Sequence, residues 1–299
     1  MADASWLTKF PTMERADLLL IRKVMDSGYR DFSRSYGDLI ESMFDPLLRF
    51  LIWFEKLLLQ TPWWLVLIVL VALVYLVSRS WKLSVSVIGA FLLIGYFGMW
   101  ENTMRTLSII TVCTLLSIAI GIPVGISMAR SDRVQAVVTP ILDIMQTMPA
   151  FVYLIPVVML LGIGKVPGVI AVVIYAIPPV IRLTNLGIRL VDKEVLEAAS
   201  AYGATPWQRL SGVQLPLAMP TIMAGINQTI MMALAMVVIA SMIGVKGLGQ
   251  PVLKSITNQY FTLGLFNGLA IVALAIIFDR VSQAYARRMQ KHMKGVVDG

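Results

Sequence analysis

The sequence predicts an all-α, polytopic membrane protein with about seven transmembrane helices. Of its 299 residues, 58% are hydrophobic and only 14% are charged, which is outside the range of soluble globular proteins. A helix that spans a bilayer needs roughly 17 to 25 mainly apolar residues. Seven charge-poor stretches supply them, although the fifth is short for a span: 56–79, 82–101, 105–130, 133–165, 165–182, 209–246 and 254–279.

The Lys and Arg residues predict the orientation of these spans. If the polar stretch 190–216 is placed in the cytoplasm, thirteen of them flank the spans inside, against four outside: Arg105, Lys165, Lys246 and Lys254. The positive-inside rule then predicts a multi-pass protein of the inner (plasma) membrane, with the N-terminus outside and the C-terminus in the cytoplasm. The net charge of +8 is explained by this topology, so we expect lipid around the chain and no nucleic-acid partner.

Residues 1–61 are expected to form an outer, periplasmic N-terminal tail. Residues 1 to about 36 are polar and show no strong periodicity, whereas an apolar repeat at helical spacing starts at Leu39 and is interrupted by Arg49 and Glu55. This pattern is typical of an amphipathic helix at the membrane interface. A long N-terminal extension of the first span stays open as an alternative.

The remaining chain divides into a peripheral pair, a core and a tail. Residues 62–100 hold two spans rich in Leu, Val and Ile, typical of peripheral helices that face lipid. Residues 101–285 hold spans interrupted by glycine and proline, and residues 286–299 form a basic cytoplasmic tail.

Three features of the core carry structural expectations. Gly121 and Gly125 are four residues apart, which permits a close helix contact. Pro178-Pro179 predicts that the fifth span bends or ends early near the cytoplasmic face. The glycine-rich stretch 244–249 is expected to be a flexible outer loop.

The polar stretch 190–216 predicts two short helices. Residues 193–202 are rich in helix formers, and Gly203 follows where a helix end favours a positive φ. Thr205 can cap a second helix that starts at Pro206. Pro216 is expected to end that helix. The result is a helix pair bent about Gly203, which can dock into a groove of another protein, although an ordinary amphipathic surface loop has a similar composition.

The same residues carry a resemblance to a known family. Glu197-Ala198-Ala199, Gly203 and Leu215-Pro216 resemble the EAA loop of binding-protein-dependent ABC importer permeases. The stretches 143–156, 214–229 and 237–249 resemble the glycine betaine/proline branch of that family. The resemblance covers roughly residues 100 to 285.

The resemblance implies a type I importer core like that of the methionine permeases, in a homodimer. It implies two P-loop ATPase subunits on the cytoplasmic side and an external binding protein that delivers a quaternary ammonium osmolyte. Glycine betaine is the first candidate solute; proline betaine, choline, carnitine and trimethylamine N-oxide are the others. It also implies that six residues couple the chain to the ATPase: Glu197, Ala198, Ala199, Gly203, Leu215 and Pro216.

No covalent chemistry is visible in the sequence. Cys113 is the only cysteine and His292 the only histidine, which argues against a metal cluster within one chain. The run Gly162-Ile163-Gly164-Lys165 is followed by Val166 and so lacks the pattern of a phosphate-binding loop. We therefore expect no enzyme activity and no cofactor on this chain, with ATP and magnesium on the partner ATPase. No cleavable signal peptide is expected either.

The span 133–165 supplies the first candidates for a translocation path. Asp143 is the only carboxylate inside a predicted span, where a charge costs about 2.5 to 3.5 kcal/mol unless it is paired or faces water. It lies either along the path, with Gln146 and Thr147, or at the cytoplasmic boundary of a span that starts near Met145. In an alternative function, ion-coupled secondary transport, Asp143 would be the coupling carboxylate.

Five further residues complete the candidate path. Pro149 interrupts the span, and aromatic faces can attract a methylated ammonium with up to about 2 kcal/mol when desolvated, although aromatic residues also serve as packing. Polar side chains on the Met-rich span 209–246 are the last candidates. The residues are Pro149, Phe151, Tyr153, Asn227 and Gln228. A non-transporting scaffold is a third function, which the glycine- and proline-interrupted spans disfavour.

Overall fold

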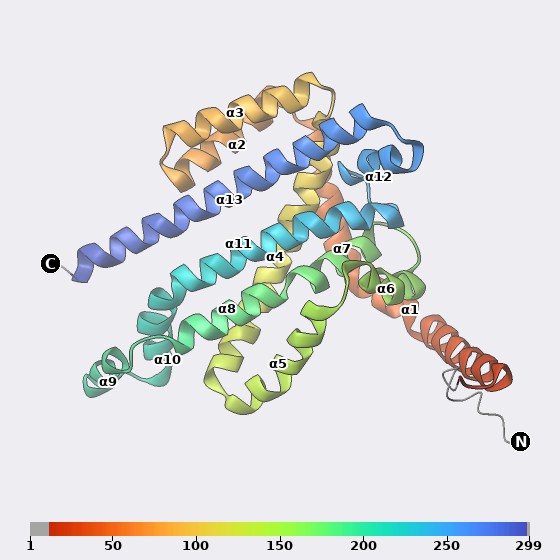
Figure 1. Ribbon diagram of the computed structural model, residues 1–299. Coiled ribbons are helices and arrows are strands. Elements are labelled where there is room, and N and C mark those ends of the chain that lie inside the picture. The colour runs from red at the N-terminus through yellow and green to blue at the C-terminus, as the bar shows by residue number, and fades with distance from the viewer. Residues whose placement is uncertain (1–11, 298–299) are drawn as a thin grey trace, which may run out of the picture.

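The computed structural model describes residues 12–297, and these residues form helices and no strand. Residues 1–11 of the expected N-terminal tail and residues 298–299 of the basic tail lie outside the described part. The first helix begins on one side of the molecule and the last helix ends on the opposite side (Figure 1). The prediction of an all-helical fold is confirmed.

A bundle of five helices forms the centre. It consists of α4 (Trp100–Arg130), α7 (Lys165–Ala176), α8 (Pro178–Arg189), α11 (Leu215–Ala240) and α13 (Phe261–Val297). Figure 1 shows α8, α11 and α13 side by side, with α4 crossing behind them. We call the end of this bundle that carries α9 (Lys193–Ala201) and α10 (Pro206–Arg209) the α9 end. The opposite end, which carries α12 (Gly249–Asn258), is the α12 end.

Glycine allows α8 to approach both of its neighbours closely. A Cβ on Gly125 of α4 would lie 2.7 Å from the carbonyl oxygen of Ile181 and 2.6 Å from Cβ of Thr184. On the other side, a Cβ on Gly225 of α11 would lie 3.2 Å from the carbonyl oxygen of Pro179. The close contact expected from the paired glycines of the third span is therefore present, and its partner is α8.

The described helices only partly resolve the number of spans. Four are long and apolar enough to cross a membrane: Trp100–Arg130, Lys165–Arg189, Pro206–Ile243 and Phe261–Arg288. The number is up to six if each of two sharply bent helix pairs counts as one span. The helix α3 (Trp81–Tyr96) is apolar but has 16 residues. A total of about seven spans stays a prediction.

The span expected within residues 133–165 is interrupted at Pro149, as its sequence indicated, and the break is sharp. The chain forms α5 (Asp132–Thr147), a 3-10 turn (Ala150–Tyr153) and α6 (Leu154–Leu161), and the two arms are bent by 112°. Met148 adopts an extended conformation with ψ 131°. It precedes Pro149, and the proline ring disfavours the α region for the residue before it, so the helix breaks there.

At two other places, proline does not end a helix as predicted. α7 and α8 form one continuous span through Pro178-Pro179, because Ile177 keeps a helical conformation and the span runs on to Arg189. Pro216 lies in the first turn of α11 and follows a π-helical turn, Leu210–Gln214. This wider turn, closed by a hydrogen bond from the Leu215 N–H to the Leu210 carbonyl, accommodates the proline and keeps α10 and α11 continuous.

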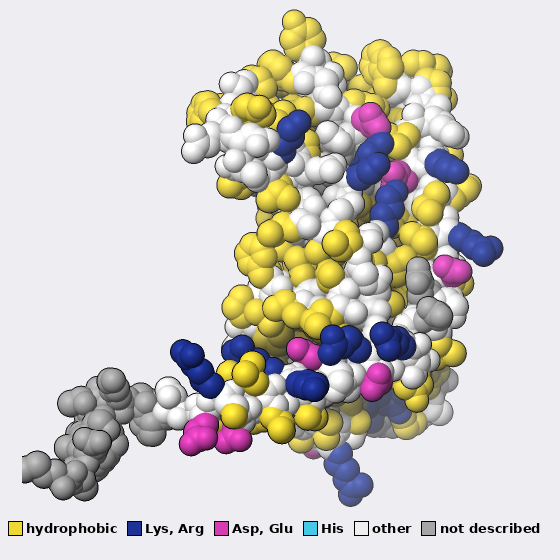
Figure 2. Space-filling model, turned by 90° about the vertical axis from the view of Figure 1, so that its right-hand side faces the viewer, with side chains coloured by type: hydrophobic (Ala, Val, Ile, Leu, Met, Phe, Trp, Pro, Cys, Tyr) yellow, Lys and Arg dark blue, Asp and Glu magenta, His cyan; other side chains and the backbone are white. Residues whose placement is uncertain are grey.

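The N-terminal helix is longer than the sequence indicated. α1 runs from Arg15 to Gln60, and its last part is bent by 113° relative to α2 (Trp63–Ser78), which excludes a straight extension of the first span. The part before residue 37 carries an exposed apolar stripe that its many charges obscure in the sequence. The stripe continues to residue 43 and consists of Leu18, Ile21, Met25, Phe32, Tyr36, Leu39 and Met43. Figure 2 shows charged side chains of both signs along the arm that leads to the grey N-terminal residues.

α2 and α3 form a peripheral hairpin that covers one side of α13 (Figure 1). The guanidinium of Arg288 donates to the carbonyl oxygen of Leu76 over 3.1 Å and ties the end of α2 to α13. Most side chains of the hairpin are exposed in the single chain. A lipid-facing, peripheral position of these two helices stays a prediction.

The stretch 244–249 is ordered by burial rather than being a flexible loop. Val245 is 2% exposed and Leu248 is fully buried. The N–H of Leu248 donates to the hydroxyl of Thr106 on α4 over 2.8 Å. The prediction of flexibility from its glycines was wrong, because the buried side chains of Val245 and Leu248 anchor the stretch.

Candidate functional site

The stretch 190–216 folds into the two predicted helices and projects from the α9 end (Figure 1). α9 and α10 contain no buried residue. Asp192 caps α9 by accepting a hydrogen bond from the Glu194 N–H over 2.9 Å. The pair of helices therefore presents nearly its whole surface for contact with another molecule.

The turn between the helices requires glycine at position 203. Gly203 has a φ of +78°, and its N–H donates to the Ser200 carbonyl over 3.0 Å. The next N–H, from Ala204, donates to the Ala199 carbonyl over 3.1 Å, which completes a Schellman motif. No atom lies within 4 Å of a Cβ built on Gly203, so the backbone conformation, and not space, demands this residue.

The second helix is fixed to the first by side chains. Thr205 and Gln208 form a reciprocal capping box. The guanidinium of Arg209 then reaches back and donates to the hydroxyl of Ser200 over 3.0 Å. The angle between α9 and α10 is thus set by local hydrogen bonds.

An apolar anchor holds this helix pair on the bundle. Leu210 is 1% exposed and packs with Ile188, Ala218 and Ile222 of α8 and α11. At the tip, Tyr202 is 94% exposed and Trp207 is also exposed. A firmly seated base with exposed aromatic rings is an arrangement that suits docking into a protein groove.

The six residues proposed for coupling occupy different parts of this element. Glu197 and Ala198 are exposed on α9, Ala199 is half-buried beside them, and Gly203 is exposed at the turn. Leu215 is half-buried and Pro216 exposed in the first turn of α11, beyond the π-helical turn. The structure therefore places the first four on the projecting pair and the last two at its base.

The break between α5 and α6 brings together several of the residues proposed for a path. Gln146, Thr147, Pro149 and Phe151 are all exposed in the single chain around this break. Thr147 caps its own helix, since its hydroxyl donates to the Ile144 carbonyl over 3.0 Å. Three polar or aromatic side chains are thus free to meet a solute or a second copy of the chain.

Asp143 and Tyr153 have partners inside the chain. The carboxylate of Asp143 accepts a hydrogen bond from the guanidinium of Arg182 on α8. Tyr153 is 5% exposed and donates its hydroxyl to the Met145 carbonyl, so it connects the two arms across the break. Its ring packs edge-on against Tyr175, with 5.6 Å between the ring centroids.

Asn227 takes part in a polar contact between α11 and α13. Its side-chain N–H donates to the carboxylate of Asp279 over 2.9 Å, and its oxygen accepts from the hydroxyl of Ser282 over 2.6 Å. Gln283 also donates to Asp279, over 2.8 Å. The neighbouring Gln228 is exposed. Asn227 therefore pairs with α13, whereas Asp143 pairs with α8.

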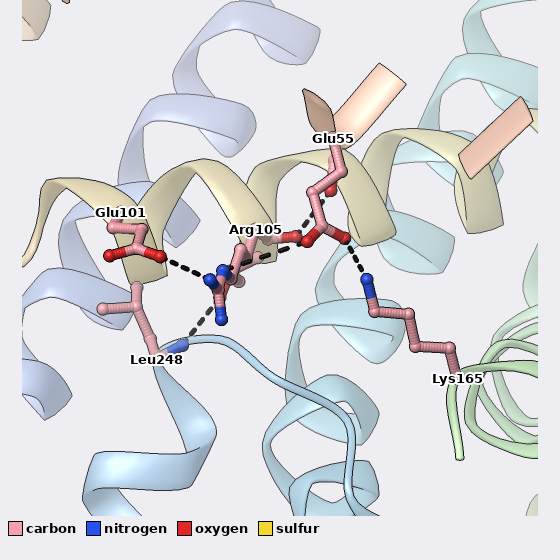
Figure 3. Close-up of polar contacts among 7 residues, drawn as sticks. Glu55, Glu101, Arg105, Lys165 and Leu248 are labelled. Carbon is pink, nitrogen blue, oxygen red and sulfur yellow. Dashed lines mark hydrogen bonds and ion pairs between the residues drawn. The ribbon is translucent and has the colours of Figure 1, made fainter. Parts of the chain in front are cut away.

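The sequence interpretation missed an ionic network at the α12 end (Figure 3). Glu55 of α1 is 7% exposed, and its carboxylate lies 2.7 Å from the ammonium of Lys165 on α7. The same carboxylate lies 3.9 Å from the guanidinium of Arg105 on α4, which also pairs with Glu101 one turn earlier. The network joins three helices that are far apart in the sequence.

The only sequence signal for this network is the position of its charges at the ends of apolar stretches. Glu55 was interpreted as an interruption of the N-terminal helix, and Arg105 and Lys165 as charges of outer loops. Such single charges have many possible partners, so their pairing follows only from the packing of α1 across α4 and α7.

Among the side chains that the structure describes, no group of His, Cys, Asp and Glu could hold a metal ion. Cys113 is a buried free thiol, and the side chain of His292 lies outside the described part of the chain.

Comparisons with known proteins agree on one family. Residues 121–291 match the family described as binding-protein-dependent transport system inner membrane component. The chain is similar to the glycine betaine/proline betaine transport system permease protein ProW of Escherichia coli (strain K12), with 50% identity over 234 residues, which are 78% of this chain and 66% of ProW. It thus spans about two thirds of the length of that relative.

Two other relatives are covered more fully. The glycine betaine/carnitine transport permease protein GbuB of Listeria monocytogenes serotype 1/2a (strain 10403S) is 50% identical over 76% of this chain and 82% of its own length. The glycine betaine transport system permease protein OpuAB of Bacillus subtilis (strain 168) is 42% identical over 91% of this chain and 96% of its own.

Solved structures show a similar fold. One inward-facing structure of the MetNI methionine ABC transporter has a chain that superposes with a TM-score of 0.57 at 22% identity, covering 62% of this chain and 93% of its own. A chain of an amino acid ABC transporter superposes with a TM-score of 0.52 at 23% identity, covering 66% of this chain and 98% of its own.

Proposed function

Because the chain belongs to the family of binding-protein-dependent transport system inner membrane components, we propose that it is the permease subunit of an ATP-driven importer for glycine betaine or a related compatible solute. The observation that carries the solute class is the 42–50% identity to permeases named for glycine betaine. Proline betaine and carnitine occur in the names of two of these relatives, choline and trimethylamine N-oxide in the names of others, and all four remain candidates.

In this proposal the pair α9–α10 is the docking element for a separate ATPase. The turn at Gly203, the small side chain of Ala198 and the carboxylate of Glu197 lie on the part of this pair that projects beyond the bundle. Leu210 anchors the base of the pair. Two copies of a P-loop ATPase would bind ATP and magnesium on the cytoplasmic side, one for each copy of this chain. This chain would bind neither, since its sequence offers no phosphate-binding loop.

The break between α5 and α6 is our candidate for the translocation path. Gln146, Thr147 and Phe151 are exposed there in the single chain, where a second copy can complete the passage. The ring of Phe151 offers a face for a methylated ammonium. Tyr153 is buried and supports the break from behind, so we assign it a structural role.

The orientation follows from the distribution of Lys and Arg. With the α9 end in the cytoplasm, the C-terminus is cytoplasmic and the N-terminus is outside, where a binding protein would deliver the solute. The apolar stripe of α1 then lies on the outer surface of the membrane, with its charged face toward water. Ion-coupled transport gains no support, because Arg182 balances the charge of Asp143.

Reconstitution tests this function directly. The chain should be co-purified with its ATPase from native membranes, placed in liposomes with the binding protein, and assayed for uptake of radiolabelled glycine betaine with and without ATP. We expect uptake only with ATP and the binding protein. Uptake by the chain alone, in the absence of an ATPase, would show that the proposal is wrong.

A pair of glycine variants tests the docking element. Gly203→Ala places a side chain at a left-handed position, which costs about 1 to 2 kcal/mol, and we expect a loss of ATP-driven uptake of about tenfold, since 1.4 kcal/mol corresponds to a factor of ten. The matched control is Gly89→Ala on α3, where no atom lies within 4 Å of the new Cβ and φ is ordinary. The two variants should differ in uptake and in the amount of ATPase that co-purifies.

A further inference from the structure

α8 leads directly into the element proposed to bind the ATPase. Three residues separate the end of α8 at Arg189 from the start of α9 at Lys193. Arg189 fixes this end of α8, because its guanidinium donates to the Met128 carbonyl of α4 over 2.8 Å and lies 2.7 Å from the carboxylate of Asp132 on α5. A displacement of α9 would therefore move the end of α8 that contacts α5.

A second ionic contact joins α8 to α5 farther from the α9 end. Arg182 lies seven residues before Arg189, and its guanidinium pairs with Asp143. The Nε of Arg182 is buried and has no hydrogen-bond partner among the described residues, so the contact with Asp143 is the one that holds this side chain. Asp143 lies four residues before Thr147, where α5 ends at the break.

Apolar packing holds α5 only weakly. Leu142 is its one buried residue. By contrast, α8 contacts α4 so closely that a Cβ on Gly125 would collide with the Ile181 carbonyl. Leu142 packs with Val180 and Ile181 of α8. The orientation of α5 relative to this tightly packed pair therefore rests on few contacts, and two of them are ionic.

We propose that Arg182 and Asp143 form a positioning pair that transmits movement of α9 and α10 through α8 to the break at Met148-Pro149. The inference rests on the proposed importer function and adds the connection between the ATPase side and the path. Arg189 with Asp132 forms the first link, and Arg182 with Asp143 forms the second, one helical turn from the break. The pair acts through the geometry of α5 and does not itself contact the solute.

The test compares uptake with ATP hydrolysis in the complete complex. Asp143→Asn and Arg182→Gln each remove one charge of the pair, and the double variant Asp143→Arg with Arg182→Asp restores it with the charges exchanged. Glu101→Gln is the matched control, because it removes a more exposed carboxylate from an ion pair at the α12 end. Each complex is reconstituted with its ATPase and binding protein, and solute uptake and phosphate release are measured in the same liposomes.

We expect each single variant to assemble with the ATPase and to keep hydrolysis within about twofold of wild type, while uptake per ATP falls about tenfold, a factor typical of coupling between sites. The exchanged pair should recover most of the lost uptake, and Glu101→Gln should match wild type. A merely structural role would instead lower hydrolysis and uptake together, which would overturn the inference, as would single variants with wild-type uptake per ATP. If wild type itself shows no ATP-driven uptake, the proposed function fails first.

Discussion

The α12 end and the α9 end of the molecule both carry ion pairs, but only the α12 end buries one of its paired carboxylates. The side chain of Glu55 at the α12 end is 10% exposed and is shared by two cations. Toward the α9 end, Asp143 and Asp132 are 57% and 89% exposed in their pairs with Arg182 and Arg189.

The difference separates a fixed end from an adjustable one. A buried carboxylate that loses its partners is left desolvated, so α1, α4 and α7 resist separation at the α12 end. Exposed pairs can exchange their partner for water at little cost, so α5 can change its orientation against α8 without loss of the fold. α8, which precedes the proposed docking element, is thus connected to a helix, α5, that can move.

The largest effect is expected from Glu55→Gln. The change leaves the cations of Lys165 and Arg105 without their shared carboxylate, and breaking a buried pair in this way destabilises a protein by about 3 kcal/mol or more. Thermal unfolding of the purified complex in detergent, followed by tryptophan fluorescence, measures the loss. An unchanged midpoint would mean that the α12 end is not fixed by this network.

A smaller loss is expected from Gly125→Ala in the contact between α4 and α8. The new methyl would lie 2.7 Å from the Ile181 carbonyl, and overpacking of this kind costs about 1 to 3 kcal/mol. The same unfolding assay applies, with Gly89→Ala as the control. If Gly125→Ala and Gly89→Ala had the same unfolding midpoint, close packing against α4 would not be what holds α8 rigid.

Tyr153→Phe should lower stability by about 1 kcal/mol, because it leaves the Met145 carbonyl without its donor while keeping the ring against Tyr175. Proteolysis or hydrogen exchange at residues 145–153 should detect a looser break. Phe151, which is exposed next to Tyr153, supplies the control. Phe151→Leu should leave hydrogen exchange at residues 145–153 unchanged and affect only uptake.

The smallest effect should come from Asp132→Asn. This carboxylate is 89% exposed, and surface pairs of this kind contribute little that can be measured. We expect no change in the unfolding midpoint. A clear fall would show that the α9 end depends on its charges as strongly as the α12 end does.

The features that the sequence predicts well depend on neighbouring residues. Gly203 at the end of a helix-forming run required a left-handed turn, and Thr205 before Pro206 required a cap; both are present. The glycines of α4 likewise permitted a close helix contact. The turn and the cap depend on the backbone within a few residues, so the local pattern predicts them. The glycines predict that a close contact forms but not that α8 is the partner.

The features that the sequence obscured depend on partners far along the chain. Glu55 and Lys165 pair across 110 positions, and Asp143 and Arg182 across 39. Proline was also a poor guide to helix ends: Pro149 interrupts its helix, whereas Pro216 follows a π-helical turn that absorbs it. The conformation of the preceding turn decides between these outcomes, and it is set by packing.

The length of α1 has a consequence for the crowding of these proteins in a membrane. A helix of 46 residues is about 69 Å long. If its apolar stripe lies on the membrane surface, each chain occupies lipid area far outside its own spans. The helix would then act as a spacer that sets how densely such complexes can be packed side by side.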